Sequence, residues 1–375
     1  MRRKQFNKVL ATGIAMIMTA ASLAGCTTQS SNTAPTTTPA AATAESNTTQ
    51  AQQTETQPQS NYPTKEITVV VPWNPGGGTD LTVRTLVEEM SGVLGKRMTV
   101  TNMAGASGSV GTQDVYDSAK DGYKILGHGM MAFTNSQVMG LTDVSYKEWI
   151  VWDAAFSPNV IAVRKDSPYK SIDDLVEAMK ADPGKITCSS AGVGSGGHIG
   201  ATVFTEGLGV TYEHITYDGG NPAIIAALSG EVDFTAQLSM EMVDMLRSGD
   251  MVGLACLSDN DMVIEGANGT ITIPSIKTIA PDMANMLPVG ESFGILVPGE
   301  TPDDVVAKID EAYKTAVASE SFKKFTEEKG MIIFAYDVDQ TSEYLDKLAS
   351  IVCWTLYDVG SAKISPDTVG IPRLN

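Results

Sequence analysis

The segment VPWNPGGGTD, residues 71–80, sets the frame for the rest of the chain. It follows an apolar run at 67–71 that is typical of a buried strand, and we predict Thr79 as the N-cap of a helix. Three consecutive glycines raise the conformational entropy lost on folding, so this loop must serve a purpose that side chains would block. The helix is predicted from apolar residues that recur at helical spacing, namely Val83, Leu86, Val87, Met90 and Leu94.

The same unit of strand, glycine-rich loop and helix recurs along the chain. The loops lie at 74–80, 104–111 and 191–198, with a looser example at 218–222. Alternating strands and helices favour an α/β fold in which mostly parallel sheets are flanked by helices. The rhythm restarts after Pro158, and this predicts two halves.

The C-terminal third is predicted to return to the first half. The chain would cross between the halves near 153–163 and again near 291–298, and hinges are expected near 153–163 and 286–298. This layout predicts domain 1 at 62–158 plus 291–375 and domain 2 at 159–290.

The first 61 residues are predicted to be a processing signal and a linker. Residues 1–25 combine four basic residues with an apolar segment, as a secretory signal peptide does. The signal ends in Leu-Ala-Gly-Cys26, which resembles a bacterial lipobox with Cys26 as the lipidated residue; a chance cysteine after an ordinary signal is the alternative. Residues 26–61 are rich in Thr, Ser, Gln and Pro and lack the apolar residues needed for a core.

Composition narrows the function classes. Without residues 1–25 the chain has 22 basic and 44 acidic residues, a balance of −22, so we expect no nucleic-acid partner. The remaining cysteines, Cys188, Cys256 and Cys353, are too few and too dispersed for a disulfide framework. The three histidines show no metal-ligand spacing, and neither a metal nor a cofactor is predicted.

The glycine-rich loops are candidate anion sites. In open α/β sheets, ligands bind beyond the carboxyl ends of strands, where helix N-termini present unpaired amides. The alternative is that the glycines only form tight turns. GVGSGG at 192–197 also matches a dinucleotide fingerprint, and Ser195 with His198 could suggest a hydrolase, but Val193 breaks the nucleophile-elbow pattern.

Four further residues are candidates for the ligand site. His128 follows a strand whose end should share an edge with the 74–80 loop, although a hydrogen-bonded loop histidine is the alternative. Tyr217 precedes the fourth glycine-rich loop. Trp73 is the most plausible aromatic at the site, with core packing as its alternative. Gln237 lies on a strand predicted at 232–238.

Taken together, the motifs resemble a known family. VPWNPGGGTD, NMAGASGSVG, DGYKILG, ITYDGGNPAIIAALSGEVDF and GILVPGETPDDVVAKI occur in an order similar to that of the substrate-binding receptors of tripartite tricarboxylate transporters, often called the Bug family. The resemblance covers nearly all of 65–375. It implies a two-domain type II periplasmic-binding-protein fold, a hinged clamshell.

The resemblance also implies which loops hold the ligand. One jaw would carry Gly76, Gly77, Gly78, Thr79 and Asp80, and the other Ser190, Gly194, Ser195 and His198. The chain departs from the family in having glycines at 196 and 197 instead of a hydroxyl pair, and Asp218 where lysine is frequent. The resemblance also implies that the position of Gln237 varies and helps to set selectivity. An acid beside an anion site is unexpected, so we predict that Asp80 turns toward the first-turn amides of its helix or binds a bridging water.

The resemblance therefore implies a binding protein and no enzyme. We expect a monomeric, extracytoplasmic, lipid-anchored receptor at the cell membrane that passes a di- or tricarboxylate, an amino acid or an aromatic acid to membrane permease subunits. The alternative is a sensor of the same fold that presents its closed form to a signalling partner. An enzyme is the third reading.

Overall fold

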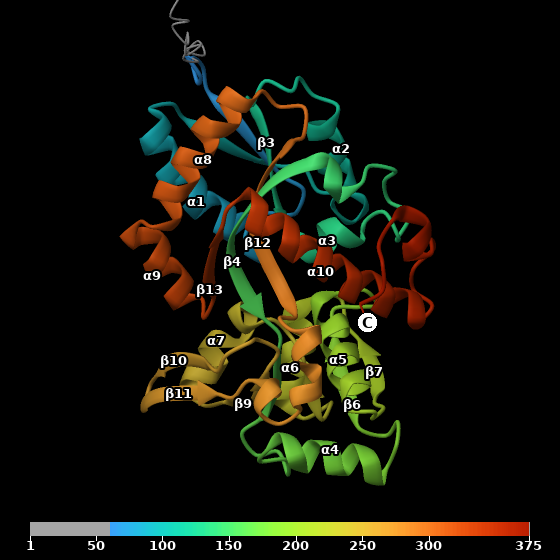
Figure 1. The fold of residues 1–375 in the computed structure, drawn as a ribbon. Helices are drawn as coiled ribbons and strands as arrows, with labels where there is room; N and C mark the ends of the chain where they lie inside the picture. Colours follow the sequence, from blue (N-terminus) through green and yellow to red (C-terminus); the bar gives the residue numbers. More distant parts are fainter. Residues whose placement is uncertain (1–60, 375) are drawn as a thin grey trace, which may run out of the picture. The chain divides into compact units, whose positions relative to one another are not determined.

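The computed structural model describes residues 61–374, which form two β-sheets, a hairpin and the helices that cover the sheets (Figure 1). The predicted signal peptide, Cys26 and all but the last residue of the predicted linker lie outside the described residues. Within the described range, no helix combines the length and the apolar character needed to cross a membrane.

The first sheet has the strand order β13-β4-β12-β3-β1-β2. Its strands are β1 (Ile67–Val71), β2 (Met98–Asn102), β3 (Lys124–Gly129), β4 (Trp149–Pro158), β12 (Gly290–Pro298) and β13 (Ile332–Tyr336). The helices around it are α1 (Gly78–Leu94), α2 (Ser109–Tyr116), α3 (Met130–Asn135), α8 (Asp303–Val317), α9 (Glu320–Glu328) and α10 (Val338–Asp358).

Strand β1 is apolar except for Thr68, because helices cover both faces of its sheet. Val69 and Val71 lie in a cluster with α1, α8 and α9, whereas Val70 faces a second cluster with α2, α3 and α10. Side chains alternate between the faces of a strand, so a continuous apolar run indicates burial on both.

The second sheet has the order β7-β6-β8-β5-β9. Its strands are β5 (Val160–Arg164), β6 (Thr187–Ser190), β7 (Glu213–Thr216), β8 (Phe234–Thr235) and β9 (Met251–Cys256). Helices α4 (Ile172–Ala181), α5 (Gly196–Gly207), α6 (Gly220–Ser229) and α7 (Ser239–Ser248) accompany it. Ser171 caps α4, with Asp174 completing the capping box. Five short 3-10 turns span Ala106–Gly108, Tyr146–Glu148, Ile276–Thr278, Pro281–Met286 and Pro366–Val369.

Two chain segments that run side by side connect the two sheets. Asn159 alone separates β4 of the first sheet from β5 of the second, and its N–H donates to the carbonyl of Val289, directly before β12. Its side-chain amide donates to the carbonyls of Gly196 and Ala236. The outgoing and returning segments are thus joined to each other and to the start of α5.

The α/β fold class is confirmed, but both sheets are mixed and not mostly parallel. In the first sheet β1 is parallel to β2 and β3, whereas β12 is antiparallel to β3 and β4. In the second, β6 is parallel to β7 and β8, whereas β5 is antiparallel to β8 and β9. Because β4 leaves the first sheet and β12 returns to it, the two strands run in opposite directions.

A hairpin, β10 (Met262–Gly266) with β11 (Gly269–Ile273), was missing from the prediction. It packs against α7 and β9. Ile264 and Ile273 are buried in the cluster of α6 and α7, whereas Val263 is exposed. The hairpin is therefore buried on one face and exposed on the other.

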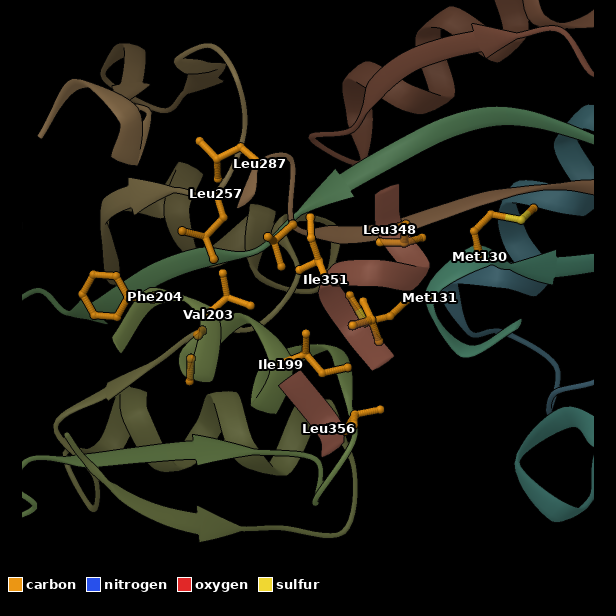
Figure 2. Packing of buried hydrophobic residues seen from close by; sticks show 14 of the residues in the cluster. Met130, Met131, Ile199, Val203, Phe204, Leu257, Leu287, Leu348, Ile351 and Leu356 are labelled. Carbon is orange, nitrogen blue, oxygen red and sulfur yellow. The ribbon is translucent and has the colours of Figure 1, made fainter. Parts of the chain in front are cut away.

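A large apolar cluster links the helices of the two sheets (Figure 2). Ile351 and Leu356 of α10 lie near Ile199 and Val203 of α5, and the two helices are in contact. Among the described residues, Cys188, Cys256 and Cys353 are buried and free.

Candidate ligand-binding site

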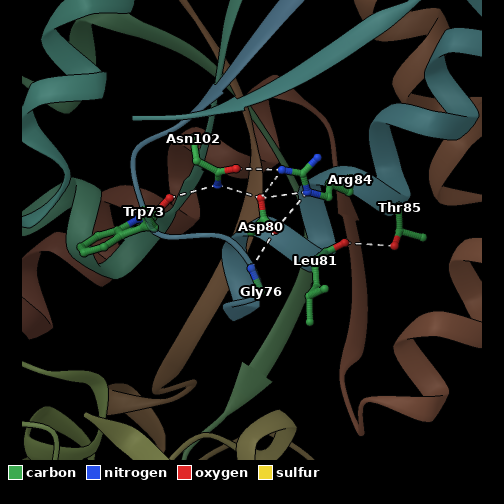
Figure 3. A network of polar contacts seen from close by, with 7 residues as sticks. All are labelled: Trp73, Gly76, Asp80, Leu81, Arg84, Thr85 and Asn102. Carbon is green, nitrogen blue, oxygen red and sulfur yellow. Dashed lines mark hydrogen bonds and ion pairs between the residues drawn. The ribbon is translucent and has the colours of Figure 1, made fainter. Parts of the chain in front are cut away.

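The glycine-rich loop before α1 is fixed by the carboxylate of Asp80 (Figure 3). Asp80 accepts a hydrogen bond from the Gly76 N–H at 2.9 Å, and Arg84 Nε donates to both of its oxygens at 2.9 and 3.0 Å. Asn102 Nδ2 donates to Asp80 Oδ1 at 2.8 Å and to the Trp73 carbonyl at 3.0 Å. Burial alone would raise the pKa of Asp80, but the hydrogen bonds from Arg84, Gly76 and Asn102 lower it below the usual value.

Two expectations for this loop were wrong. Thr79 is not the N-cap of α1: the cap is Gly77, and no described side chain caps the helix. Asp80 does turn toward an amide, but toward that of Gly76 in the loop and not toward the first turn of its own helix. The Gly76 N–H is therefore occupied, while the first-turn amides of α1 lack a side-chain cap.

The loop before α5 is held in a similar way by neutral groups. Ser195 is the N-cap and accepts from the His198 N–H at 3.4 Å. His198 Nδ1 accepts from the Gly194 N–H at 3.2 Å, so the proton of the neutral ring is on Nε2. Burial, followed by the neighbouring His214, lowers the pKa of His198 to about 4.

Ser190 lies behind this loop. It is fully buried, its hydroxyl is 2.6 Å from His214 Nε2, and the rings of His214 and His198 stack with centroids 4.4 Å apart. The Ser195 hydroxyl does not donate to the His198 ring, whose Nδ1 accepts from the Gly194 N–H instead, so the two do not form a nucleophile–base pair. Ser190 and His198 support the loop from behind.

Trp73 and His128 pack against each other at the first loop. Their ring centroids are 5.8 Å apart, edge to face, and a Cβ on Gly108 would come within 3.2 Å of Trp73 and 3.1 Å of His128. Burial lowers the pKa of His128 to about 4, despite the hydrogen bond of its Nδ1 to the Gly129 carbonyl at 2.7 Å. His128 is thus a neutral, buried support for Trp73.

A cavity of about 390 Å³ lies between elements of the two sheets, and we call it the site cavity. Of the predicted residues, Trp73, Gly194 and Ser195 line it, whereas residues 76–80 do not. Gly78 is close to Met240 of α7, whose Sδ would lie 2.8 Å from an added Cβ. The remaining lining residues are Ser107, Met131, Ala132, Asn135, Met139, Leu141, Ala191, Val193, Gly196 and Glu291.

Gln237 and Tyr217 lie away from the cavity wall. Gln237 is buried with its side-chain amide against Gly197. In the amide orientation that satisfies both ends, it donates to Glu241 and accepts from the Ala191 N–H, each at 3.3 Å. Gln237 thus supports the wall through Ala191, while Tyr217 packs on the cluster of α6 and α7.

Glu291 is the residue that the sequence analysis missed. It lies at the start of β12, and its Oε1 accepts from the Met131 N–H at 2.7 Å. Burial raises the pKa of Glu291 to about 8, with Asp153 and Glu241 adding to the rise. Glu291 is half-buried, and an acid directly before the apolar run SFGILVP was a signal that could have been read, because a carboxylate with a perturbed pKa in a cleft is a candidate for a functional role.

Other cavities and metal chemistry do not compete with this site. A larger cavity of about 540 Å³ is lined by residues of β10, α9 and β13, and none of the predicted site residues lines it. Among the described residues, no three His, Cys, Asp or Glu side chains are grouped so that they could hold a metal ion.

Comparisons with known proteins identify the family of the chain. The model of the tripartite tricarboxylate transporter family receptor matches residues 82–350. The chain is 27% identical over 275 residues to a UPF0065 protein of Bordetella pertussis, covering 72% of this chain and 82% of that protein. It is 25% identical to the protein BugT of the same organism, covering 76% and 86%.

Solved structures give the same result for the fold. A TctC solute binding protein from Polaromonas matches with a TM-score of 0.67 and 23% identity, over 79% of this chain and 99% of that one. The matched family consists of substrate-binding receptors and not of enzymes. The predicted two-domain periplasmic-binding-protein type of fold is confirmed. The chain therefore belongs to the tripartite tricarboxylate transporter family receptors, the Bug family.

Proposed function

We propose that the protein is an extracytoplasmic, lipid-anchored receptor that captures a small organic acid and delivers it to the permease of a tripartite tricarboxylate-type transporter. The observation that supports this proposal most is the site cavity, whose wall combines Trp73 and α3 of the first sheet with residues 191–196 of the second. Concave sites between two sheets, lined by apolar groups and a few polar ones, are where small ligands bind.

Within this proposal, domain 1 comprises 62–158 plus 291–375 and domain 2 comprises 159–290. Closure would bend the paired segments around Asn159 and Val289, because only these short connections join the sheets. The contact of Ser157 Oγ with Ser239 Oγ at 2.9 Å and the apolar cluster of α10 and α5 limit that motion.

The ligand contacts would come mainly from the second loop. Ser195 keeps its hydroxyl proton for a ligand, because its oxygen only accepts from His198. Gly196 starts α5 and its amide has no partner within the helix. The amides of Gly77, Gly78 and Thr79 would join on closure, since they lie at the uncapped start of α1.

The test is ligand-dependent stability of the purified full chain. A panel of mono-, di- and tricarboxylates, amino acids and aromatic acids is added and unfolding is followed by heat. At 100 times the Kd, a true ligand stabilises the folded state by about 2.7 kcal/mol. If no acid in the panel shifts the transition, the proposal is wrong.

A matched pair of variants locates the binding. Ala132→Phe places a ring in the site cavity from its half-buried position on α3 and should abolish the ligand-induced shift. Val110→Phe enlarges an exposed side chain on α2 and should leave the shift unchanged. Equal effects of the two variants would place the ligand elsewhere.

The anchor has its own test. Fractionation of cells that make the full chain should place it with membranes, and Cys26→Ser should release it into the soluble extracytoplasmic fraction. Retention of the Cys26→Ser protein in membranes would contradict the anchor without affecting the ligand proposal.

A further inference from the structure

Internal carboxylates already occupy two amides of the kind that a ligand carboxylate would use. Asp80 holds the Gly76 N–H, and Glu291 holds the Met131 N–H in the first turn of α3. Of these two acids, only Glu291 lines the site cavity. The cavity wall therefore already contains an acid group of the protein.

Positive charge is missing from the same wall. None of the described residues that line the site cavity is lysine or arginine. Arg84, near the first loop, is committed to Asp80 and Asn102. Burial lowers the pKa of His128 and His198 to about 4, so both are neutral at neutral pH. A ligand that is only anionic would meet a carboxyl group and no compensating cation.

Glu291 has one oxygen committed and one available. Its Oε1 accepts from Met131, and no hydrogen bond from a described residue reaches Oε2. The carboxyl group packs on Gly129, where a Cβ would come within 2.8 Å of it, and the side chain lines the cavity. Capping α3 accounts for Oε1 but leaves Oε2 beside the ligand space.

We infer that the ligand is a small amino acid or another amine-bearing acid, whose ammonium group pairs with Glu291 while its carboxylate meets Ser195 and the first-turn amides of α5. The inference rests on the proposed function. Glu291 and Ser195 line the same cavity, and its volume of about 390 Å³ suits a ligand of this size. The ammonium group brings the positive charge that the cavity wall lacks, and it would form a charge-assisted hydrogen bond with Glu291.

The ionisation of Glu291 gives a signature for this pairing. The titratable groups facing it are Asp153 on β4, Glu241 on α7 and Tyr344 on α10, none of which carries a positive charge. Burial and these acids raise the pKa of Glu291 to about 8, so much of the free protein holds a proton there at pH 7. An ammonium group favours the ionised form, and its binding releases that proton.

The experiment compares acids that differ only by an amine. Isothermal titration of the full chain uses aspartate against succinate, glutamate against glutarate, alanine against propionate and phenylalanine against 3-phenylpropionate. We expect one amine-bearing member to bind about 10- to 100-fold more tightly than its partner. Its affinity should rise by up to about tenfold per pH unit from pH 6.5 to 8, with proton release seen in buffers of different ionisation enthalpy.

Variants attribute the preference to Glu291. Glu291→Gln keeps an oxygen for Met131 and should remove both the preference and the proton release. Asp174→Asn changes a carboxylate that caps the distant helix α4 and should change neither. If Glu291→Gln fails to fold, proton release on ligand binding by the unmodified protein still tests whether the ammonium group pairs with Glu291.

The outcomes separate the two proposals. Tighter binding of a des-amino acid, with affinity that falls as pH rises, would overturn the ammonium pairing and leave the receptor function intact. It would mean that protonated Glu291 donates to a ligand carboxylate. Absence of binding by every acid in the wider panel would overturn both.

Discussion

The loops before α1 and α5 use one device with different chemistry. In each, an acceptor side chain four residues further along holds a glycine N–H: Asp80 holds that of Gly76, and His198 holds that of Gly194. Asp80 is charged and paired with Arg84, whereas His198 is neutral and stacked on His214. The first loop is thus fixed by an ionic network and the second by weaker, uncharged contacts.

The difference assigns different tasks to the two loops. The second loop lines the site cavity, with Val193 exposed there, while residues 76–80 do not line it. A glycine-rich loop at a helix start is therefore not automatically an anion site, because the protein can supply the anion itself. What distinguishes the loops is how firmly each is held, and the predictions below test that.

The largest effect is expected from Asp80→Ala. The change leaves the Gly76 N–H and the Arg84 guanidinium without their partner at a site where Asp80 is 2% exposed. We expect a loss of about 2–4 kcal/mol in the free energy of unfolding, measured by urea denaturation. Asp114→Ala, which breaks a half-exposed ion pair with Lys124, is the control and should lose less than about 1 kcal/mol.

Equal losses in those two variants would show that the first loop is held no more firmly than a surface pair. The same measurement on His198→Ala should fall between them, at about 1–2 kcal/mol, because a neutral hydrogen bond and part of a ring stack are lost.

Acidification should weaken the second loop before the first. His198 has a folded-state pKa of about 4, below its usual 6.5, so between these values the unfolded state binds a proton that the folded state does not. Stability contributed by neutral His198 therefore falls as pH falls through this window, by at most about 1.4 kcal/mol per pH unit. The Asp80 pKa is lowered, so its contribution is lost only at pH values below the usual value of an aspartate, 3.8.

The measurement must be a difference between variants. Burial raises the pKa of Asp153 and Glu291 to about 8, and their contribution to stability falls as pH rises, opposite to His198. Unfolding free energies of the parent and His198→Gln should therefore converge from pH 6.5 to 4. Amide exchange should show protection factors that drop for Gly194 and persist for Gly76; loss at both together would contradict the distinction.

The sequence predicted the strands and helices better than the side chains that form the site. Apolar periodicity and glycines located the strands and helices around both loops, because local patterns encode burial. The pairing of Asp80 with Gly76 was out of reach, since a loop amide and a first-turn amide look alike in sequence. Glu291 was missed because β12 comes from the distant C-terminal third, and only the folded sheet places it beside Met131.

Buried polar groups show the same limit. Asp153 is fully buried, and within residues 61–374 no side chain or backbone N–H lies in hydrogen-bonding geometry to either of its carboxyl oxygens. The sequence analysis placed a crossing near 153–163 but predicted no strand at 149–158, and it gave this acid no role. Register places it opposite Gly294, at the irregularity in the pairing of β4 with β12.

The smallest effect, and the finest test of the comparison, comes from one glycine in each loop. Gly77 has an ordinary φ of −78° and no neighbour closer than 3.9 Å to an added Cβ. Alanine is a poorer N-cap than glycine, but it lowers the entropy of the unfolded chain, so Gly77→Ala should change stability by less than about 0.5 kcal/mol. Gly194 has a φ of +81°, and Gly194→Ala should lose about 1 kcal/mol because that conformation is strained for any residue with a Cβ. Thermal unfolding measures both.

The bulkier Gly77→Val tests whether the first loop contacts the ligand at all. We expect normal stability but lost ligand affinity, because the valine side chain would shield the loop amides when the domains close. Unchanged affinity would mean that the second loop binds the acid alone.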